Sequence, residues 1–564
     1  MPHRPLALAL GLAALLALAG SAEGAASRPK AVRAAVCGAT CYAAPAGSGA
    51  LFLFTGHGWG HGVGMSQYGA QGYAENGWTY DSILAHYYPG TTLTQAPTST
   101  IRVLLANAQK KLTISSQVPF TVLDATGTTH TLAAGKFSFG PGLKIAVDGQ
   151  PAQPLDPPLT FSPATGSTLT LGRAYRGQLV VDVVDGKLRA IDVVGLEQYL
   201  DGVVPAEMPP TWAPAALQAQ AVASRSYALA TRVGAAPFDV YADTRSQVYR
   251  GVSAERASTN AAVAATAGEV LDFNGKIATT YFFSTSGGQT ESAVDVWGGK
   301  SLPYLVSVPD PFDLISPYHN WGPVPVPGLT VARSLGVPGT IVGATTTTNT
   351  AGRVAMLNLA SITGASSTSQ KTTAVTGTVA TSELGLRSTW WNVGMLSLAA
   401  PTARAPVPYG TRVKLTGLVH GVGGVMLEMR SAQTPWSDAG PVVPAAGGVV
   451  QMTEKPSIST DYRLATRKAA APYVRIRVTP RLRVRRSSGA LRGSELPALP
   501  GALVLVQREN PAGSPEWTTV ARGTVDPGGM FSVGSSLGPG TYRAVVAPGH
   551  GYWPGASAPL NVSG

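Results

Sequence analysis

Sequence patterns that favour α-helices end at about Pro401, and this divides the chain of 564 residues into two parts. The alanine-rich stretch Ala215–Thr231 has the apolar spacing of a helix, with Thr211 as its predicted N-cap. Shorter helices are predicted at Tyr80–Tyr88 and Glu255–Ala267. Between the helices, apolar and polar residues alternate in short runs, as they do in strands. The first part is therefore predicted to be an α+β domain of the catalytic type.

The second part contains an internal repeat without helix patterns. Each copy has a tryptophan, a glycine pair that starts 11 residues later, and then a Tyr-Arg pair. The key positions are Trp436, Gly447 and Tyr462 in the first copy, and Trp517, Gly528 and Tyr542 in the second. Two strand-rich copies at this spacing predict tandem all-β sandwich-like modules, over 401–480 and 481–564. Such modules more often bind a ligand or act as spacers than catalyse a reaction.

The first 26 residues have the pattern of a secretory signal peptide. An apolar stretch, Leu6–Ala19, is followed by small residues at which a peptidase could cut. The stretch is shorter than the roughly 20 residues of a membrane-spanning helix, and an uncleaved anchor is the alternative. We therefore expect an exported, cell-wall protein without a stable membrane span. Residues 27–49 form a leader, in which Cys37 and Cys41 are expected to make a disulfide in an oxidising compartment.

The chain is basic, with a formal net charge of +12. A basic excess attracts polyanions without identifying them. Because export is predicted, anionic polymers of a cell envelope are expected partners and nucleic acid is not. Much of the excess lies in one segment, at Arg475, Arg477, Arg481, Arg483, Arg485, Arg486 and Arg492. Two interpretations stay open, a solvated sheet face and a dedicated binding surface.

Glycine occupies every second position from Gly56 to Gly64, which predicts a tight loop with positive φ angles. The loop lacks the Lys-Ser/Thr of a phosphate-binding loop. Tyr68 replaces the second glycine of a serine-nucleophile elbow. His57 and His61 have zinc-helix spacing, but the glycines between them disfavour a helix, so no metal and no cofactor are predicted. The favoured interpretation is a polar binding loop with His61, Ser66 and Gln67 as its candidate side chains, and a structural histidine packed in a turn is the alternative for either histidine.

Glu207 is the strongest candidate for chemistry. It lies among apolar residues, in a proline-bounded connection just before the long predicted helix. Burial there would raise its pKa, as a general acid requires. The positive end of the following helix opposes this by about 0.3–1 kcal/mol, and a helix-dipole partner is the alternative role. Glu197 and Asp201, four residues apart, are expected to be solvated surface charges.

Five segments together resemble the stage II sporulation protein D (SpoIID/LytB) family over about 50–395. They are Leu196–Tyr227, Gln247–Gly251, Ser284–Glu291 with Trp297, Leu384–Thr389, and His61–Ala70 with Tyr87–Thr91. In the family's usual order the His61–Ala70 block comes last, whereas here it comes first. The domain is therefore predicted to be circularly permuted, with the strand near Leu51–Phe54 beside the strand near Trp390–Val393.

The resemblance implies a peptidoglycan lytic transglycosylase. Glu207 would be the single acid/base that cleaves MurNAc–GlcNAc glycan strands and leaves 1,6-anhydro ends, where hydrolases generally use two carboxyls. One alternative is a non-catalytic glycan-binding enhancer of a cell-wall amidase; another is a hydrolase with Asp201 or Glu291 as base. The residues implied to line the groove are His61, Ser66, Gln67, Gln220, Arg225, Tyr249, Ser284, Ser286 and Glu291.

Overall fold

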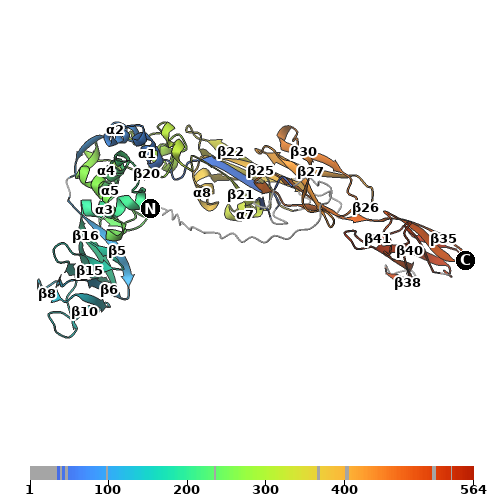
Figure 1. Cartoon of the computed structure of the whole chain (residues 1–564), viewed down its shortest axis with the longest axis horizontal. Coiled ribbons are helices and arrows are strands. Elements are labelled where there is room, and N and C mark those ends of the chain that lie inside the picture. Colours follow the sequence, from blue (N-terminus) through green and yellow to red (C-terminus); the bar gives the residue numbers. More distant parts are fainter. Residues whose placement is uncertain are drawn as a thin grey trace, which may run out of the picture.

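The computed structural model describes residues 35–37, 41–44, 49–96, 99–233, 237–364, 369–399, 405–510, 516–534 and 536–563. The predicted signal peptide lies outside these residues. The chain forms an elongated molecule, with its helices gathered toward one end and strand-only modules at the other (Figure 1). Within the described ranges, no helix is both long and apolar enough to cross a bilayer.

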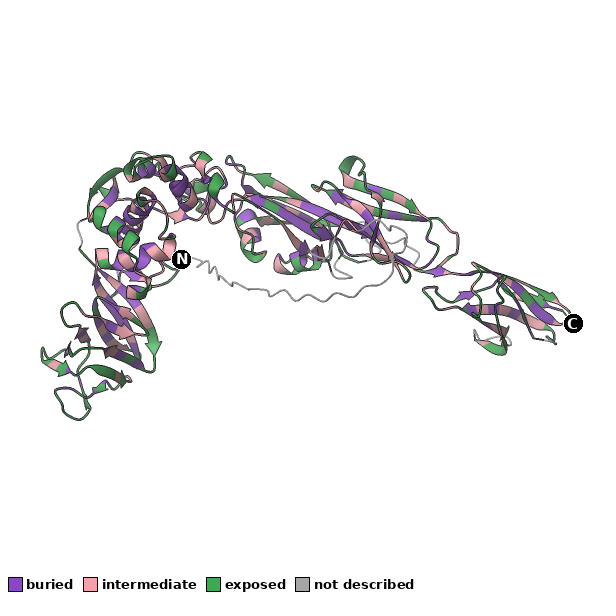
Figure 2. Cartoon of the chain, in the orientation of Figure 1, coloured by how far each residue is buried: buried purple, intermediate pink, exposed green. Residues whose placement is uncertain are grey.

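Five helices pack together, four of them around a central one. They are α1 (Gln67–Glu75), α2 (Tyr80–Tyr87), α3 (Leu196–Glu207), α4 (Pro214–Ala230) and α5 (Ala257–Ala265). The central helix is α4, whose residues contribute to two hydrophobic clusters, one shared with α1 and α2 and the other with α3. Its many alanines let neighbouring helices approach from several sides, and Figure 2 shows buried residues on these helices as well as along the strands of the middle of the molecule. The three predicted helices are confirmed to within two residues at each end.

The predicted cap of α4 is wrong. Ala213, not Thr211, occupies the N-cap, and it makes no side-chain cap. Instead, the backbone N–H of Ala213 donates to Oε1 of Gln71 on α1, at 2.9 Å. A side chain distant in sequence thus satisfies a helix end that local sequence leaves open.

A strand-rich unit is formed by the segment between α2 and α3, together with β17 from the segment after α4. Its larger sheet has the order β17-β5-β16-β15-β12-β7-β8, and its smaller sheet the order β14-β13-β6-β9. The larger sheet consists of β17 (Val240–Tyr241), β5 (Thr100–Gln109), β16 (Lys187–Gly195), β15 (Gln178–Val184), β12 (Leu159–Ser162), β7 (Phe120–Leu123) and β8 (Thr129–Leu132). The smaller consists of β14 (Arg173–Tyr175), β13 (Leu169–Leu171), β6 (Leu112–Ser116) and β9 (Gly135–Phe139). Strand β16 runs directly into α3, so this unit fixes the start of the helix that carries Glu207.

The middle of the molecule is one antiparallel sheet. Its strands, in order, are β21 (Asn320–Pro327), β2 (Leu51–His57), β25 (Trp391–Ala399), β27 (Val413–His420) and β30 (Val449–Glu454). Within it Phe54 pairs with Val393, and Leu51 with Leu396. The predicted adjacency of these two strands is therefore confirmed, while the permutation itself stays a prediction.

This sheet is covered on both faces. Phe52 and Phe54 pack under α7 (Gly328–Ser334), α8 (Gly377–Glu383) and the hairpin strands β22 (Thr340–Thr348), β23 (Val354–Ile362) and β24 (Gln370–Thr376). Leu51 and Leu53 point to the opposite face and join a different cluster, as alternation along a strand requires. Because β25 pairs with β27, the sheet continues across the predicted border at 395–401.

A second sheet packs on the Leu51 face and completes the first module. It contains β1 (Tyr42–Ala43), β32 (Ala469–Ala470), β31 (Thr460–Ala465), β28 (Met426–Ser431), β29 (Ser437–Pro441) and β33 (Val474–Ile476). Tyr42 and Ala43 of the predicted leader thus belong to this sheet. The predicted Cys37–Cys41 disulfide is formed, and the Cys37 N–H donates to Oε1 of the buried Glu428 at 2.7 Å.

The last module also has two sheets. One contains β35 (Arg481–Ser487), β36 (Ala490–Leu496) and β39 (Met530–Val533). The other contains β38 (Trp517–Thr524), β37 (Leu503–Glu509), β40 (Gly540–Ala547), β41 (Gly555–Ala556) and β42 (Leu560–Val562). Their facing apolar residues form a separate core. Within the described part of the chain, no α-helix follows residue 405, in agreement with a mixed domain followed by all-β modules.

Candidate functional site

Glu207 is the last residue of α3. The connection predicted from sequence is therefore helical, and Pro205 lies inside the helix. Position matters electrostatically, because the carboxyl end of a helix carries partial negative charge and disfavours a carboxylate. Burial acts in the same direction and is the larger cause, and together they oppose ionisation. The pKa of Glu207 is raised to about 7 by burial.

Two groups limit that rise. The backbone of Val248 makes a hydrogen bond to the Glu207 carboxyl, and the positive charge of Arg250 favours the carboxylate, so both lower its pKa. The side chain is only partly buried, and Arg250 is exposed. A carboxyl that is half protonated near neutral pH, and still reachable, can donate a proton and later take one back.

The segment Gln247–Gly251 is held in place by contacts on both of its sides. The OH of Tyr199 on α3 donates to Oε1 of Gln247 at 3.1 Å, and the Gln247 amide donates to the Ser224 carbonyl of α4 at 3.3 Å. Gly202 lets the Tyr249 ring approach α3, because a Cβ there would lie 2.7 Å from that ring. Because its contacts with α3 and α4 fix the Gln247–Gly251 segment, Val248 and Arg250 are held close to Glu207.

A row of aromatic side chains leads away from Glu207. Tyr227 is close enough for the charge of Glu207 to help raise its pKa, which burial and neighbouring groups bring to about 12. The Tyr227 ring lies 5.6 Å from Tyr281, and Tyr281 lies 4.6 Å from Trp297, measured between ring centroids. Trp297 is 49% exposed. We call Tyr227, Tyr281 and Trp297 the aromatic row.

The glycine-rich loop ends beside this row. Gly58, Gly60, Gly62 and Gly64 all have positive φ, as predicted. The His61 ring lies 5.3 Å from Trp297 and 6.0 Å from Tyr281. Burial lowers the His61 pKa to about 4, so the ring is neutral at pH 7. Its Nδ1 accepts from the Val63 N–H at 3.0 Å, which leaves the proton on Nε2.

The loop runs along the Ser284–Glu291 segment. Strand β3 (Met65–Ser66) pairs in parallel with β20 (Phe282–Phe283), and the Glu291 N–H donates to the Gly62 carbonyl at 2.7 Å. The fold thus brings together two motifs that are more than 200 residues apart in the sequence. The Tyr68 N–H donates to the Ser284 carbonyl oxygen at 3.0 Å.

A buried aspartate makes hydrogen bonds to both the glycine-rich loop and the Ser284–Glu291 segment. Asp313, in the 3₁₀ turn Pro311–Ile315, accepts hydrogen bonds from several groups and pairs with His319 at 3.0 Å. Its donors are the hydroxyls of Ser66 and Thr285 and the backbone N–H groups of Ser286 and Gly287. Ser66 and Ser286 are therefore fully buried, and the structure gives them a positioning role for the loop.

Other expected lining residues also have internal partners. Arg225 is buried and forms a bidentate pair with Glu197, at 2.9 and 2.6 Å, so Glu197 is not the free surface charge expected from sequence. The Tyr249 OH donates to Asp192 at 3.0 Å. The buried Glu291 lies 3.2 Å from Arg353 Nε and accepts from Asn349, while Gln67 donates to Gln220 at 3.4 Å.

Asp201, the other expected surface charge, is half-buried. Burial raises its pKa to about 6, and the charge of Glu255 adds to the effect. The role of Asp201 as the base of a hydrolase stays a prediction, whereas Glu291 is enclosed by its Arg353 and Asn349 contacts. Among the described residues no cluster of three or more His, Cys, Asp or Glu could hold a metal ion.

Sequence reasoning missed three residues that organise the site: Asp310, Asp313 and Arg353. The two aspartates are three residues apart in a proline-containing turn, but no local pattern indicates that both are buried. Asp310 accepts from the Tyr87 OH at 2.9 Å, and burial raises its pKa to about 7. Its carboxyl fits only because position 69 is glycine, since a Cβ there would overlap it.

Comparison with known proteins finds a family model that matches the part of the chain around Glu207. Residues 184–273 match the sequence model of the family described as stage II sporulation protein (SpoIID). The matched range contains α3, α4, Glu207 and the Gln247–Gly251 segment. The chain therefore carries a SpoIID-family domain, set in a strand-rich molecule.

Individual relatives share part of the chain. It is 36% identical over 149 residues to the stage II sporulation protein D of Bacillus subtilis, covering 23% of this chain and 43% of that protein. It is 42% identical over 122 residues to a Bacillus subtilis protein named amidase enhancer, covering 22% and 16%. An uncharacterized protein of Brachyspira hyodysenteriae is 37% identical over 153 residues, covering 27% and 41%. The chain thus spans less than half the length of each of these relatives.

Proposed function

We propose that the protein cleaves peptidoglycan glycan strands as a lytic transglycosylase, with Glu207 as its acid/base. The observation that carries the proposal is a partly exposed carboxyl whose pKa is raised to about 7 at the carboxyl end of α3, inside the range matched by the family. A general acid works best when its pKa is near the working pH.

In this proposal the protonated Glu207 donates its proton to the glycosidic oxygen as the C1–O bond breaks. The resulting carboxylate then accepts the proton of the sugar's own 6-hydroxyl, whose oxygen bonds to C1. The products are a free 4-hydroxyl end and a 1,6-anhydro end, and Glu207 is protonated again. The reaction needs no second carboxyl and consumes no water, whereas hydrolysis generally uses two carboxyls and consumes a water molecule.

The aromatic row and His61 are the proposed glycan-contacting surface. Aromatic faces pack against the C–H faces of sugar rings, and the neutral His61 ring adds a further uncharged face beside Trp297. The remaining predicted lining residues are proposed to position this surface through the contacts described above. They are Ser66, Gln67, Gln220, Arg225, Tyr249, Ser286 and Glu291. Ser284 is proposed to act through its backbone.

The test of the proposed function is mass spectrometry of soluble products released from purified peptidoglycan, both intact and stripped of stem peptides. We expect 1,6-anhydro ends from the wild-type protein. Reducing ends that carry the oxygen of solvent water would instead indicate hydrolysis, and Asp201→Asn would then show whether Asp201 supplies the base.

Trp297→Ala is expected to weaken binding to peptide-stripped glycan strands about two- to tenfold, because an exposed aromatic contact contributes roughly 0.5–1.5 kcal/mol beyond area burial. Sedimentation with insoluble glycan measures the effect. Trp553→Ala is the matched control, since that tryptophan is 45% exposed but lies in the last module. Equal losses in both variants would contradict a specific role for the aromatic row.

A second candidate function rests on the 42% identity to the protein named amidase enhancer. In this case the chain would bind glycan and stimulate a cell-wall amidase without cutting the strand. An amidase assay with added protein separates the two functions, because an enhancer should stimulate equally well as wild type and as Glu207→Gln.

A further inference from the structure

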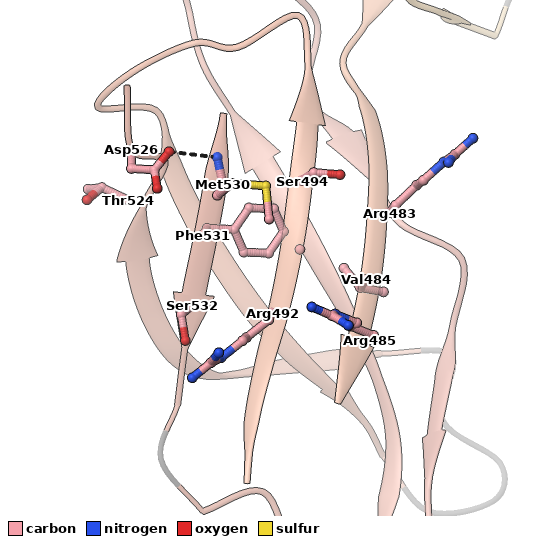
Figure 3. A pocket seen from close by; sticks show the side chains of 11 residues that line it. Arg483, Val484, Arg485, Arg492, Ser494, Thr524, Asp526, Met530, Phe531 and Ser532 are labelled. Atoms are coloured by element: carbon pink, nitrogen blue, oxygen red, sulfur yellow. Dashed lines mark hydrogen bonds between the residues drawn. The ribbon is translucent and has the colours of Figure 1, made fainter. Parts of the chain in front are cut away.

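The last module has a basic concave surface at its β35–β36–β39 sheet. The cavity has a volume of about 440 Å³ and is lined by side chains of these strands and of β38 (Figure 3). Arg483, Arg485 and Arg492 belong to it, and all three are exposed. Within the described residues none of the three makes an ion pair or a side-chain hydrogen bond. We call these three residues the arginine face.

The arrangement of the arginine face is unfavourable without an anion. Arg485 on β35 lies directly opposite Arg492 on β36. Side chains opposite each other in an antiparallel pair have Cβ atoms about 4.5–5.5 Å apart, and like charges there destabilise the sheet. The one acidic residue that lines the cavity, Asp526, uses its Oδ1 to accept the Gly528 and Met530 N–H groups. Within the part of the chain that the structure describes, neither Arg485 nor Arg492 is paired with a carboxylate.

The chemistry of the lining favours phosphate. Guanidinium groups donate paired hydrogen bonds that match phosphate oxygens, and such charge-assisted bonds are stronger than neutral ones. Hydroxyls of Ser494, Thr524 and Ser532 border the arginines, and by register Arg492 lies opposite Ser532. These hydroxyls can hydrogen-bond to the alcohols of a sugar or polyol.

Nucleic acid fits the surface less well. Binding to single strands uses exposed aromatic platforms on which bases stack. Phe531 is the only aromatic residue among those that line the cavity, and it is 4% exposed. A surface with guanidiniums and hydroxyls but no stacking platform matches a polymer whose units are small alcohols.

We infer that the arginine face binds a phosphodiester-linked polyol polymer, and so attaches the last module to an anionic polymer independently of the Glu207 site. Successive arginines on one face of a strand are two residues apart, about 6.6 Å along the strand, which suits a ligand with regularly repeated charges. This binding does not depend on glycan cleavage.

The test measures binding of the full chain to poly(glycerol phosphate) at two salt concentrations. We expect the double substitution Arg485→Gln with Arg492→Gln to weaken binding about 30-fold or more, and higher salt to weaken the wild type. The double substitution Arg467→Gln with Lys468→Gln is the matched control. It removes the same charge from an exposed turn of the first module and should change binding less than about threefold.

Thermal unfolding guards against misfolding as the cause. Because the Arg485–Arg492 pair is repulsive, its removal should leave the melting temperature unchanged or raise it. Equal losses in the two double variants would overturn the proposal, because net charge alone would then explain binding. The assigned ligand class would be overturned if the chain bound single-stranded DNA or a polyuronate as tightly as poly(glycerol phosphate), and if that binding also depended on Arg485 and Arg492.

Discussion

Glu207→Gln is expected to reduce the release of 1,6-anhydro products by about 10²- to 10⁴-fold, the usual contribution of a positioned general acid. The amide has the size of the carboxyl but cannot donate an acidic proton. In the proposed mechanism the protonated form of Glu207 is the active one, and burial raises the pKa of this carboxyl to about 7. Product formation should therefore fall as the pH rises through about 7. Mass spectrometry of products over a pH series measures both effects.

Glu383→Gln is the matched control for this prediction. Glu383 is an exposed residue at the end of α8, and the same chemical change there should leave the rate unaltered. An unchanged rate in Glu207→Gln would contradict the proposed acid. Absence of products from both wild type and variant, with glycan binding intact, would favour the amidase enhancer.

Asp313→Ala is expected to destabilise the domain by about 3 kcal/mol or more, because several buried donors lose their acceptor and each buried group left unsatisfied costs about 1–3 kcal/mol. The hydroxyls of Ser66 and Thr285 and the ring of His319 would each lose a hydrogen-bond partner. The glycine-rich loop would then lose its attachment to the Ser284–Glu291 segment. Denaturant unfolding followed by tryptophan fluorescence measures the stability.

Asp156→Ala provides the comparison for Asp313→Ala. Asp156 is exposed in the strand-rich unit, and its replacement should change stability by less than about 0.5 kcal/mol. Similar stabilities of the two variants would show that the Asp313 contacts do not hold the loop in place.

Helices and strands could be predicted where the signal is local. The alanine-rich spacing of Ala215–Thr231 predicts α4, and alternate glycines predict the positive φ angles of the loop at Gly58–Gly64. Capping of α4 could not be predicted, because the acceptor Gln71 comes from a different helix. The end of the helix patterns at about Pro401 predicts a border at 395–401, yet β25 pairs with β27 across it, since strand pairing depends on which strand edges meet rather than on local helix patterns.

Candidate chemistry at Glu207 was predictable from its apolar neighbours, but its electrostatics were not. Sequence placed Glu207 before the positive end of a helix, whereas the structure places it at the negative end of α3. The sign of the helix contribution to its pKa is therefore reversed. Arg225 and Glu291 were expected to face the ligand, and their burial with Glu197 and Arg353 became evident only in three dimensions.

Residue type and short-range spacing are enough to predict the helices and the strand-rich modules, the disulfide-forming cysteines, the glycine-rich loop and Glu207 as the candidate acid. Three features become visible only in the folded chain: which side chains surround Glu207, which polar residues are buried partners, and where arginines lie unpaired across a sheet. These features depend on segments far apart in the chain, and long-range packing sets the solvation and charge that each group experiences.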